Sequence, residues 1–102
     1  MMWQFRGQIW FWRGPSPFYF VTVPELESAQ IAQIAKSVTY GWGVIPVEVT
    51  VGATTWTTSL FPKDGRYVVP VKVLVRKAEN LELEDEIEVR LRVVTPLERR
   101  AY

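Results

Sequence analysis

The spacing of apolar side chains predicts that most of this chain is β-strand. In residues 44–51, Ile45 and Val47 alternate with other residue types, and a period of two is typical of a strand with one buried face. Residues 3–12 alternate in the same way, and Gly7 within them indicates a bulge or a close approach of another backbone. By this pattern we expect strands over residues 3–12, 18–23, 44–51, 54–61, 67–71 and 85–94.

Two segments depart from this period and are predicted to be helical. The first covers residues 28–38, where Ser28 is placed to cap the amino end. Its buried stripe would comprise Ile31, Ile34, Ala35 and Val38, which recur at helical spacing. The second is a short crossover over residues 73–79, which Asn80 would end in the left-handed conformation. Pro62–Gly65 predicts a tight turn between two strands.

A weak internal repeat links the two halves of the chain. Tyr19–Val23 parallels Tyr67–Val71 at an offset of 48 residues, and each segment precedes a helical crossover and an alternating strand. Neither half has enough strands to bury its own apolar face. We therefore expect a mostly β fold, a closed or double-split β-barrel of six to seven strands with pseudo-twofold symmetry, formed by residues 1–94. Residues 95–102 are expected to form a charged tail.

The composition excludes several kinds of chemistry. The chain has 102 residues, of which 48% are hydrophobic and 23% charged, as is typical of one globular domain. It has no cysteine and no histidine, which excludes disulfides, thiolate metal sites and the commonest general base, so we expect no cofactor. No apolar run approaches the roughly 20 residues of a membrane span. Because Gln4, Arg6 and Gln8 interrupt the apolar amino-terminal segment, we predict no signal peptide and a cytoplasmic protein.

Several short motifs resemble, in order and spacing, those of a known family. They are Gly41-Trp42-Gly43-x-Ile45-Pro46-Val47, Val51-Gly52, Trp56-Thr57-Thr58-Ser59-Leu60-Phe61-Pro62, Pro70-Val71-Lys72 and Val75-Arg76-Lys77-Ala78. Together they resemble the bacterial and archaeal DUF1905 family over about residues 3–94. The resemblance implies a double-split β-barrel, and it implies no activity because none is established for the family.

A second, partial resemblance is to the AbrB and MazE swapped-hairpin DNA-binding proteins. The matching positions, in order, are Gly65-Arg66, Pro70, Arg76, Asn80-Leu81 and Glu84-Asp85. Asn80 and Glu84 stand where that family usually has glycine. The resemblance implies a related barrel but says little about DNA binding, because a fold does not carry function with it.

Basic and acidic side chains are unevenly distributed along the chain. Residues 53–78 hold five bases and one acid, a net charge of +4, whereas residues 79–98 hold seven acids and two bases, a net charge of −5. One interpretation is that the acidic segment neutralises the basic one through exposed ion pairs, which contribute about 0–1 kcal/mol each. The other is that Lys72 and Arg76, four residues apart on one helix face, point at the same carboxylate or phosphate.

Other polar and aromatic side chains are candidates for the same site. They are Trp56, Thr58, Ser59, Arg6 and Trp42. Trp42, between two glycines, would cover a barrel mouth either as a plug or as a lid over a ligand. The others have structural alternatives, because tryptophan fills narrow barrels and threonine favours strands. Ser59 and Lys72 are the two residue types of a Ser–Lys nucleophile pair. The sequence around Ser59 does not predict the sharp strand-to-helix turn that would expose a nucleophilic serine, so we do not expect an enzyme.

The sequence therefore favours a non-enzymatic module that binds a small anionic ligand, or a partner's carboxylate, at a barrel mouth. Two alternatives stay open, namely nucleic-acid binding by an AbrB-like dimer and a structural or protein-interaction scaffold. The net charge of only +1 speaks against tight binding to a phosphate backbone. Pro46 and Pro70 speak against a scaffold that pairs through a strand edge, because proline lacks the N–H group that such pairing needs. We expect a monomer or a homodimer without membrane contact.

Overall fold

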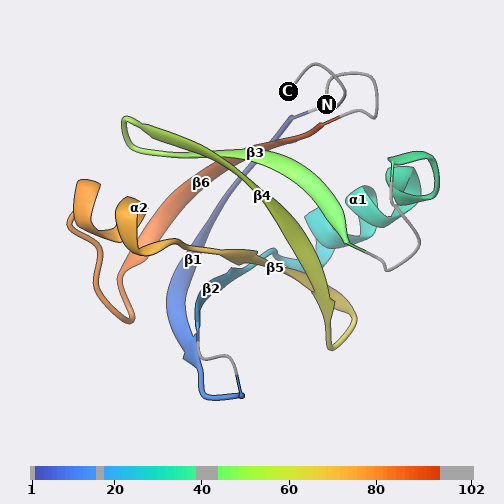
Figure 1. The fold of residues 1–102 in the computed structure, drawn as a ribbon. Helices are drawn as coiled ribbons and strands as arrows, with labels where there is room; N and C mark the ends of the chain where they lie inside the picture. The colour runs from blue at the N-terminus through green and yellow to red at the C-terminus, as the bar shows by residue number, and fades with distance from the viewer. Residues whose placement is uncertain (1, 16–17, 39–43, 95–102) are drawn as a thin grey trace.

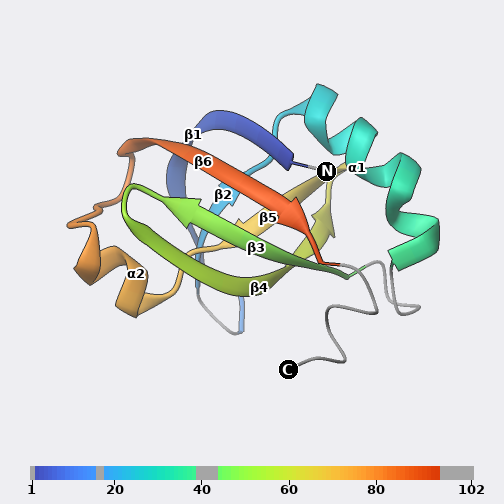
Figure 2. The same ribbon diagram turned by 90° about the horizontal axis from the view of Figure 1, so that it is seen from above.

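Six strands form a closed barrel in the computed structural model, which describes residues 2–15, 18–38 and 44–94. In chain order the elements are β1 (Met2–Trp12), β2 (Phe18–Thr22), α1 (Glu25–Val38), β3 (Ile45–Val51), β4 (Thr54–Lys63), β5 (Arg66–Pro70), α2 (Val73–Ala78) and β6 (Glu86–Val93). Around the barrel the order is β1-β2-β5-β4-β3-β6, and the neighbouring strands are antiparallel. The two helices lie on opposite sides of the barrel (Figure 1 and Figure 2). The predicted mostly β barrel is confirmed.

Two long strands turn the corners of the barrel. Residues 2–8 of β1 pair with β6, and residues 9–12 pair with β2. Strand β4 changes partner in the same way, from β3 along residues 54–60 to β5 along residues 61–63. Gly7 lies at the corner of β1, where a Cβ would come within 2.8 Å of a side chain of β2. The nearest backbone atom, Thr22 O, would be 3.5 Å away, so the close neighbour of Gly7 is a side chain rather than the predicted backbone.

The two halves of the chain are related by a pseudo-twofold axis, as the internal repeat predicts. Val21 pairs with Val69, 48 residues later, at the centre of the β2–β5 ladder. Backbone hydrogen bonds on either side repeat at the same offset, from Val23 N to Tyr67 O at 2.8 Å and from Val71 N to Tyr19 O at 2.9 Å. Strands β3 and β6 also pair with each other. The segment β1-β2-α1-β3 thus corresponds to β4-β5-α2-β6.

Inward side chains from all six strands fill the barrel. The most deeply buried are Ile9, Val21, Ile45, Val47, Val49, Leu60, Val69, Val89 and Leu91. They occupy the positions that the period of two predicts. Ile31 of α1 and Val75 of α2 join the same core, so each helix covers one side of the barrel. A filled interior leaves the outer wall and the sides under the helices as places where a ligand could bind.

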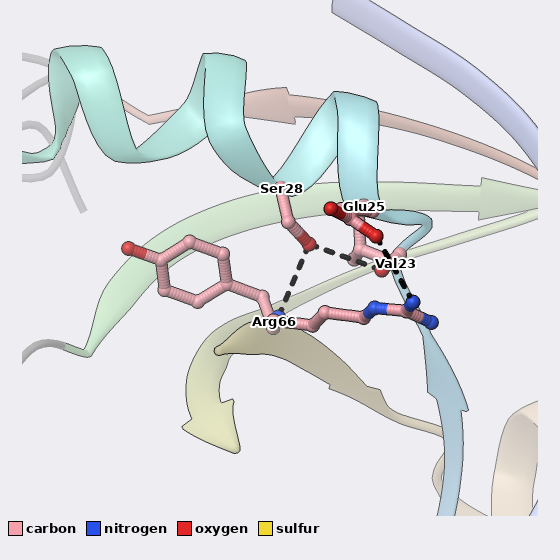
Figure 3. A network of polar contacts seen from close by, with 5 residues as sticks. Val23, Glu25, Ser28 and Arg66 are labelled. Atoms are coloured by element: carbon pink, nitrogen blue, oxygen red, sulfur yellow. Dashed lines mark hydrogen bonds and ion pairs between the residues drawn. The ribbon is translucent and has the colours of Figure 1, made fainter. Parts of the chain in front are cut away.

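Helix α1 begins at Glu25, about one turn before the predicted start at residue 28. Ser28 N donates to Pro24 O (2.8 Å), so Ser28 already lies inside the helix, and the prediction that it caps the helix is wrong. Its hydroxyl instead joins two strands, because it donates to Val23 O (3.0 Å) and accepts from Tyr67 N (3.2 Å) (Figure 3). Ser28 therefore satisfies the backbone carbonyl of Val23 and the backbone N–H of Tyr67, which are not bonded to each other, instead of capping α1.

The predicted left-handed residues Gly65 and Asn80 are confirmed, but the tight turn is shorter than the predicted Pro62–Gly65, because Pro62 and Lys63 belong to β4. Asp64 and Gly65 form the two-residue loop between β4 and β5, with φ of 52° and 78°, a conformation that aspartate and glycine tolerate. Asn80 has φ of 54° after α2, in the left-handed region. The predicted tail over residues 95–102 and the predicted lid or plug Trp42 lie outside the described residues.

Candidate ligand-binding site

A groove lies on the outer wall of the barrel, where β1, β2, β5 and β4 meet. It has a volume of about 580 Å³ and is lined by Trp12, Phe18, Phe20, Thr58, Phe61, Pro62, Lys63, Val68, Pro70 and Lys72. We refer to it as the aromatic groove. Small-molecule sites in proteins typically have volumes of roughly 300–1,000 Å³. The aromatic groove is therefore large enough for a small organic ligand.

Strand alternation places the rings of the aromatic groove on the outside. Phe20 pairs with Trp10 on one side and with Pro70 on the other, whereas the next residue, Val21, belongs to the core. Because successive side chains of a strand point to opposite faces, the row through Phe20 faces outward. The ring centroids of Trp10 and Trp12 lie 5.4 Å and 6.5 Å from that of Phe20. These packed rings form a continuous apolar wall.

Three aromatic side chains of the groove stay partly open to solvent. Trp12 is 39% exposed, Phe18 36% and Phe61 43%. Val68 is buried and closes the groove from below. A contiguous apolar patch of this kind, bordered by polar side chains, is typical of an interaction site.

Two lysines border the aromatic groove. Lys72 Nζ donates to Thr57 O (3.0 Å), and Lys63 Nζ lies 3.7 Å from the exposed carboxylate of Asp64. Each contact uses only part of an ammonium group that has three donors. The lining residues, all of which the structure describes, include no acid. The aromatic groove therefore has an apolar wall and a basic border.

Arg76 and Trp56 lie apart from this groove, on the side of the barrel that α2 covers. The Arg76 guanidinium lies over the ring of Tyr19, with Cζ 3.6 Å from the ring centroid. Trp56 packs against the core from β4. Lys72 precedes α2 and reaches the β4 backbone. Lys72 and Arg76 thus contact different partners, although their spacing would allow one shared ligand.

The remaining predicted residues are spread over the molecule. Arg6 Nε donates to Glu86 Oε1 (2.8 Å) on the outer face of β1, and this contact raises the pKa of Arg6 further above its ordinary value. Thr58 borders both the aromatic groove and a second hollow of about 660 Å³, which Ser59 lines. Of the predicted residues that the structure describes, the aromatic groove brings together Lys72 and Thr58.

The acidic segment has its own partners. Asp85 accepts a hydrogen bond from Glu82 N within the same turn (2.8 Å), and Glu79 accepts one from the Thr54 hydroxyl (2.6 Å). Among the described residues, no ion pair joins Lys72 or helix α2 to the acids that follow the helix. The ion pairs therefore do not support the interpretation that the acidic segment neutralises the basic segment, residues 53–78.

A known protein family matches most of the chain. The sequence profile described as Domain of unknown function (DUF1905) matches residues 5–91. The chain belongs to the DUF1905 family. The DUF1905 match runs from β1 into β6, so it includes both helices and every residue of the aromatic groove. The resemblance to AbrB and MazE stays a prediction.

One further comparison and one structural observation concern this DUF1905 protein. A search of the curated proteins gave no match. Within the part of the chain that the structure describes, no helix is long and apolar enough to cross a membrane.

Sequence reasoning missed the aromatic groove, although part of its signal is present. Trp10 and Trp12 occupy positions of β1 that otherwise carry polar residues, and Phe18 and Phe20 alternate with the core residues of β2. Aromatic side chains in the outward register of two strands indicate an apolar outer face. Pattern alone did not show that β4 brings Phe61 to the same face.

Proposed function

We propose that this DUF1905 protein is a binding module for a small ligand with a ring-bearing apolar body and a carboxylate. The observation that carries the proposal is the aromatic groove of about 580 Å³, with Lys63 and Lys72 at its border. Packing against the rings would supply most of the affinity, since aromatic side chains bury large areas and stack on other rings. The lysines would hold the carboxylate and fix the orientation of the ligand.

Binding rather than catalysis is the role that the lining residues support. Thr58 offers a hydroxyl and the two lysines offer ammonium donors, but the lining includes neither a carboxylate nor a histidine. Those are the groups that most often act as general bases. The groove thus has groups that recognise a ligand and lacks the usual groups that would remove a proton from it.

A panel of ring-bearing carboxylates, each paired with its neutral amide, tests the proposal by isothermal titration calorimetry. We expect carboxylates to bind more tightly than their amides. Lys63→Met or Lys72→Met should weaken carboxylate binding about fivefold, and should leave amide binding unchanged, because only the charged contact is lost. Phe61→Ala should weaken both members of each pair.

Two variants serve as matched controls. Lys77→Met removes an exposed cation of α2 that does not line the groove, and Leu26→Ala removes an exposed apolar side chain of α1. Both should bind the carboxylates as the unmodified protein does. A panel in which no carboxylate binds, or in which amides bind equally well, would contradict the proposal.

Single-stranded nucleic acid is the second candidate, because aromatic and basic side chains share this outer wall. Arg66 lies in a neighbouring hollow with Trp10 and Lys63, which extends the basic border. Bases can stack on such rings while cations follow the phosphates. Arg66 already pairs with the exposed Glu25 (3.3 Å), so we expect weak, salt-sensitive binding.

Fluorescence anisotropy with a labelled oligothymidine distinguishes the two candidates. Binding near physiological salt that Lys63→Met reduces would favour nucleic acid, and no binding even at low salt would remove this candidate. A scaffold that pairs through a strand edge receives less support, because the ring of strands is closed.

A further inference from the structure

Two equivalent tryptophans on the inner face of the barrel have different surroundings. One row of paired residues runs Trp3–Leu91–Val49–Trp56, so the two rings lie at matching ends of the row about the pseudo-twofold axis. Trp3 Nε1 donates to Gln30 Oε1 of α1 (3.0 Å). Trp56 Nε1 is shielded from solvent and has no hydrogen-bond partner.

The sequences of the two helices explain this difference. Helices α1 and α2 begin 48 residues apart, at Glu25 and Val73, which is the offset of the internal repeat. At that offset Gln30 corresponds to Ala78. A methyl group cannot accept a hydrogen bond, so α2 lacks the acceptor that α1 provides.

A second donor without a partner lies on the side of the barrel under α2. Arg76 occupies the position equivalent to Ser28, and its Nε is also shielded and unpaired. Ser28 accepts from one strand and donates to another, whereas an arginine carries only donors. Its guanidinium is held over the ring of Tyr19. Among the described residues, Trp56 Nε1 and Arg76 Nε are the buried side-chain N–H groups without a partner.

Contacts at both ends of α2 show that the two donors belong to adjacent elements, Arg76 to α2 and Trp56 to β4. Lys72 Nζ donates to Thr57 O (3.0 Å), and the Thr54 hydroxyl donates to Glu79 Oε2 (2.6 Å). Helix α2 thus runs alongside β4 in the opposite direction. Arg76 lies four residues after Lys72 and three residues before Glu79, so the three side chains share one helix face. Trp56 lies between Thr54 and Thr57 in β4.

We propose that Trp56 Nε1 and Arg76 Nε, the α2 donor pair, together bind one oxygen atom or carboxyl group of a small oxyanion. Buried N–H groups in native proteins nearly always have an acceptor, and a charged oxygen is the strongest one. The guanidinium charge favours an anion over a neutral carbonyl group. Both side chains are only partly buried, but their two N–H groups are shielded from solvent, so one of the side chains has to shift to admit the anion. This site is separate from the aromatic groove and does not depend on the proposed function.

Nuclear magnetic resonance of the indole N–H groups tests this proposal. The Trp56 resonance is assigned by its loss in Trp56→Phe, and the full chain is titrated with sodium formate, sodium phosphate or, at matched ionic strength, sodium chloride. We expect the Trp56 resonance to shift and saturate with formate, with phosphate or with both, and to move little with chloride. Saturation with only one of the two oxyanions identifies the class of ligand.

The variant Ala78→Gln supplies the acceptor that α1 already has. We expect this variant to lose the formate and phosphate response and to have a higher melting temperature in buffer without added oxyanion. Lys77→Gln adds the same side chain at the neighbouring exposed position and should keep the response.

Three results would overturn the proposal. The first is a Trp56 resonance that none of the salts moves. The second is a cross-peak from the Trp56 N–H to a long-lived bound water, because water would then satisfy the donor. The third is an oxyanion response that persists unchanged in Ala78→Gln.

Discussion

Ser28 shows how one hydroxyl group can replace a direct contact between strands. Val23 N donates directly to Tyr67 O, but the return bond from Tyr67 N runs through the Ser28 hydroxyl to Val23 O. Ser28 is 3% exposed, so water does not compete for these groups. The side chain therefore joins α1 to β2 and β5 at the point where the β2–β5 ladder ends.

We expect Ser28→Ala to lower the free energy of unfolding by about 1–3 kcal/mol, because it removes the hydroxyl that bonds the partly buried Tyr67 N–H and the buried Val23 carbonyl. Urea denaturation measures this as a lower midpoint at an unchanged slope. Arg66→Ala removes the neighbouring exposed pair with Glu25 and should cost at most about 1 kcal/mol. Equal losses in the two variants would contradict this account of Ser28.

A second residue-scale prediction concerns pH. Burial raises the pKa of the Tyr67 phenol above its ordinary value of 10.0. As the pH rises, the unfolded chain therefore loses this proton before the folded chain does, so stability is full below about pH 10 and falls above it. We expect Tyr67→Phe to lose less stability between about pH 9 and pH 11. Urea denaturation at each pH measures the free energy of unfolding. An equal loss with rising pH in Tyr67→Phe and in the unmodified protein would contradict the prediction.

At the scale of elements, β1 joins the two parts of the barrel wall. Its first residues pair with β6 and its last with β2, with Gly7 just before the change of partner. A Cβ at Gly7 would lie 2.8 Å from Val21 Cγ1 and 3.5 Å from Thr22 O. The strand can turn this corner closely over β2 because residue 7 has no side chain.

We expect Gly7→Ala to destabilise the protein by about 1–3 kcal/mol, because the added methyl group overlaps a well-packed core side chain. Val21→Ala should make room for that methyl group, so the double variant should lose less stability than the two single losses together. Gln8→Ala, at the exposed next position, is the control. If the stability loss of the double variant equals the sum of the losses of Gly7→Ala and Val21→Ala, the overlap with Val21 is not the cause.

At the scale of the whole molecule, the barrel depends on both halves of the chain. Strand β3 pairs with β4 and β6, which both belong to the second half, and β6 pairs with β1 and β3 of the first. Each half alone contains one antiparallel pair and one strand without neighbours. A two-stranded hairpin is at best marginally stable in water.

Cutting the chain in the β3–β4 turn tests this interdependence. We expect the fragments 1–52 and 53–102 to show no cooperative thermal unfolding when measured separately by circular dichroism. An equimolar mixture should recover β-structure and one cooperative transition, because β2–β5 and β3–β6 pairing is restored. A cooperative transition in either fragment as a monomer would contradict the prediction.

Much of the fold could be predicted from the sequence, because its signals are local. The alternation in residues 44–51, the Asp64–Gly65 turn and the left-handed Asn80 each depend on only a few neighbouring residues. The sequence did not predict the start of α1 at Glu25, because serine is a favoured cap residue and Ser28 was taken as the first residue of the helix. The 48-residue repeat would have corrected it, since it relates Glu25 to the predicted helix start at Val73.

The candidate sites could be predicted only in part, because they depend on which strands become neighbours. The sequence singled out Lys72 and Thr58 but placed them with Arg76 and Trp56, which lie elsewhere. A spacing of four residues showed that Lys72 and Arg76 could share a face. It could not show that the ring of Tyr19, far away in sequence, would hold the guanidinium.

The sequence alone determined the strands, the tight turns, the paired halves and the family. Each of these follows from periodicity, from backbone preferences or from motifs within one stretch of chain. The closed tertiary structure decided that outward rings of β1, β2 and β4 form one groove, and that Trp56 Nε1 and Arg76 Nε are shielded without a hydrogen-bond partner. These features require contacts between distant residues, and such contacts exist only once the ring of strands has closed.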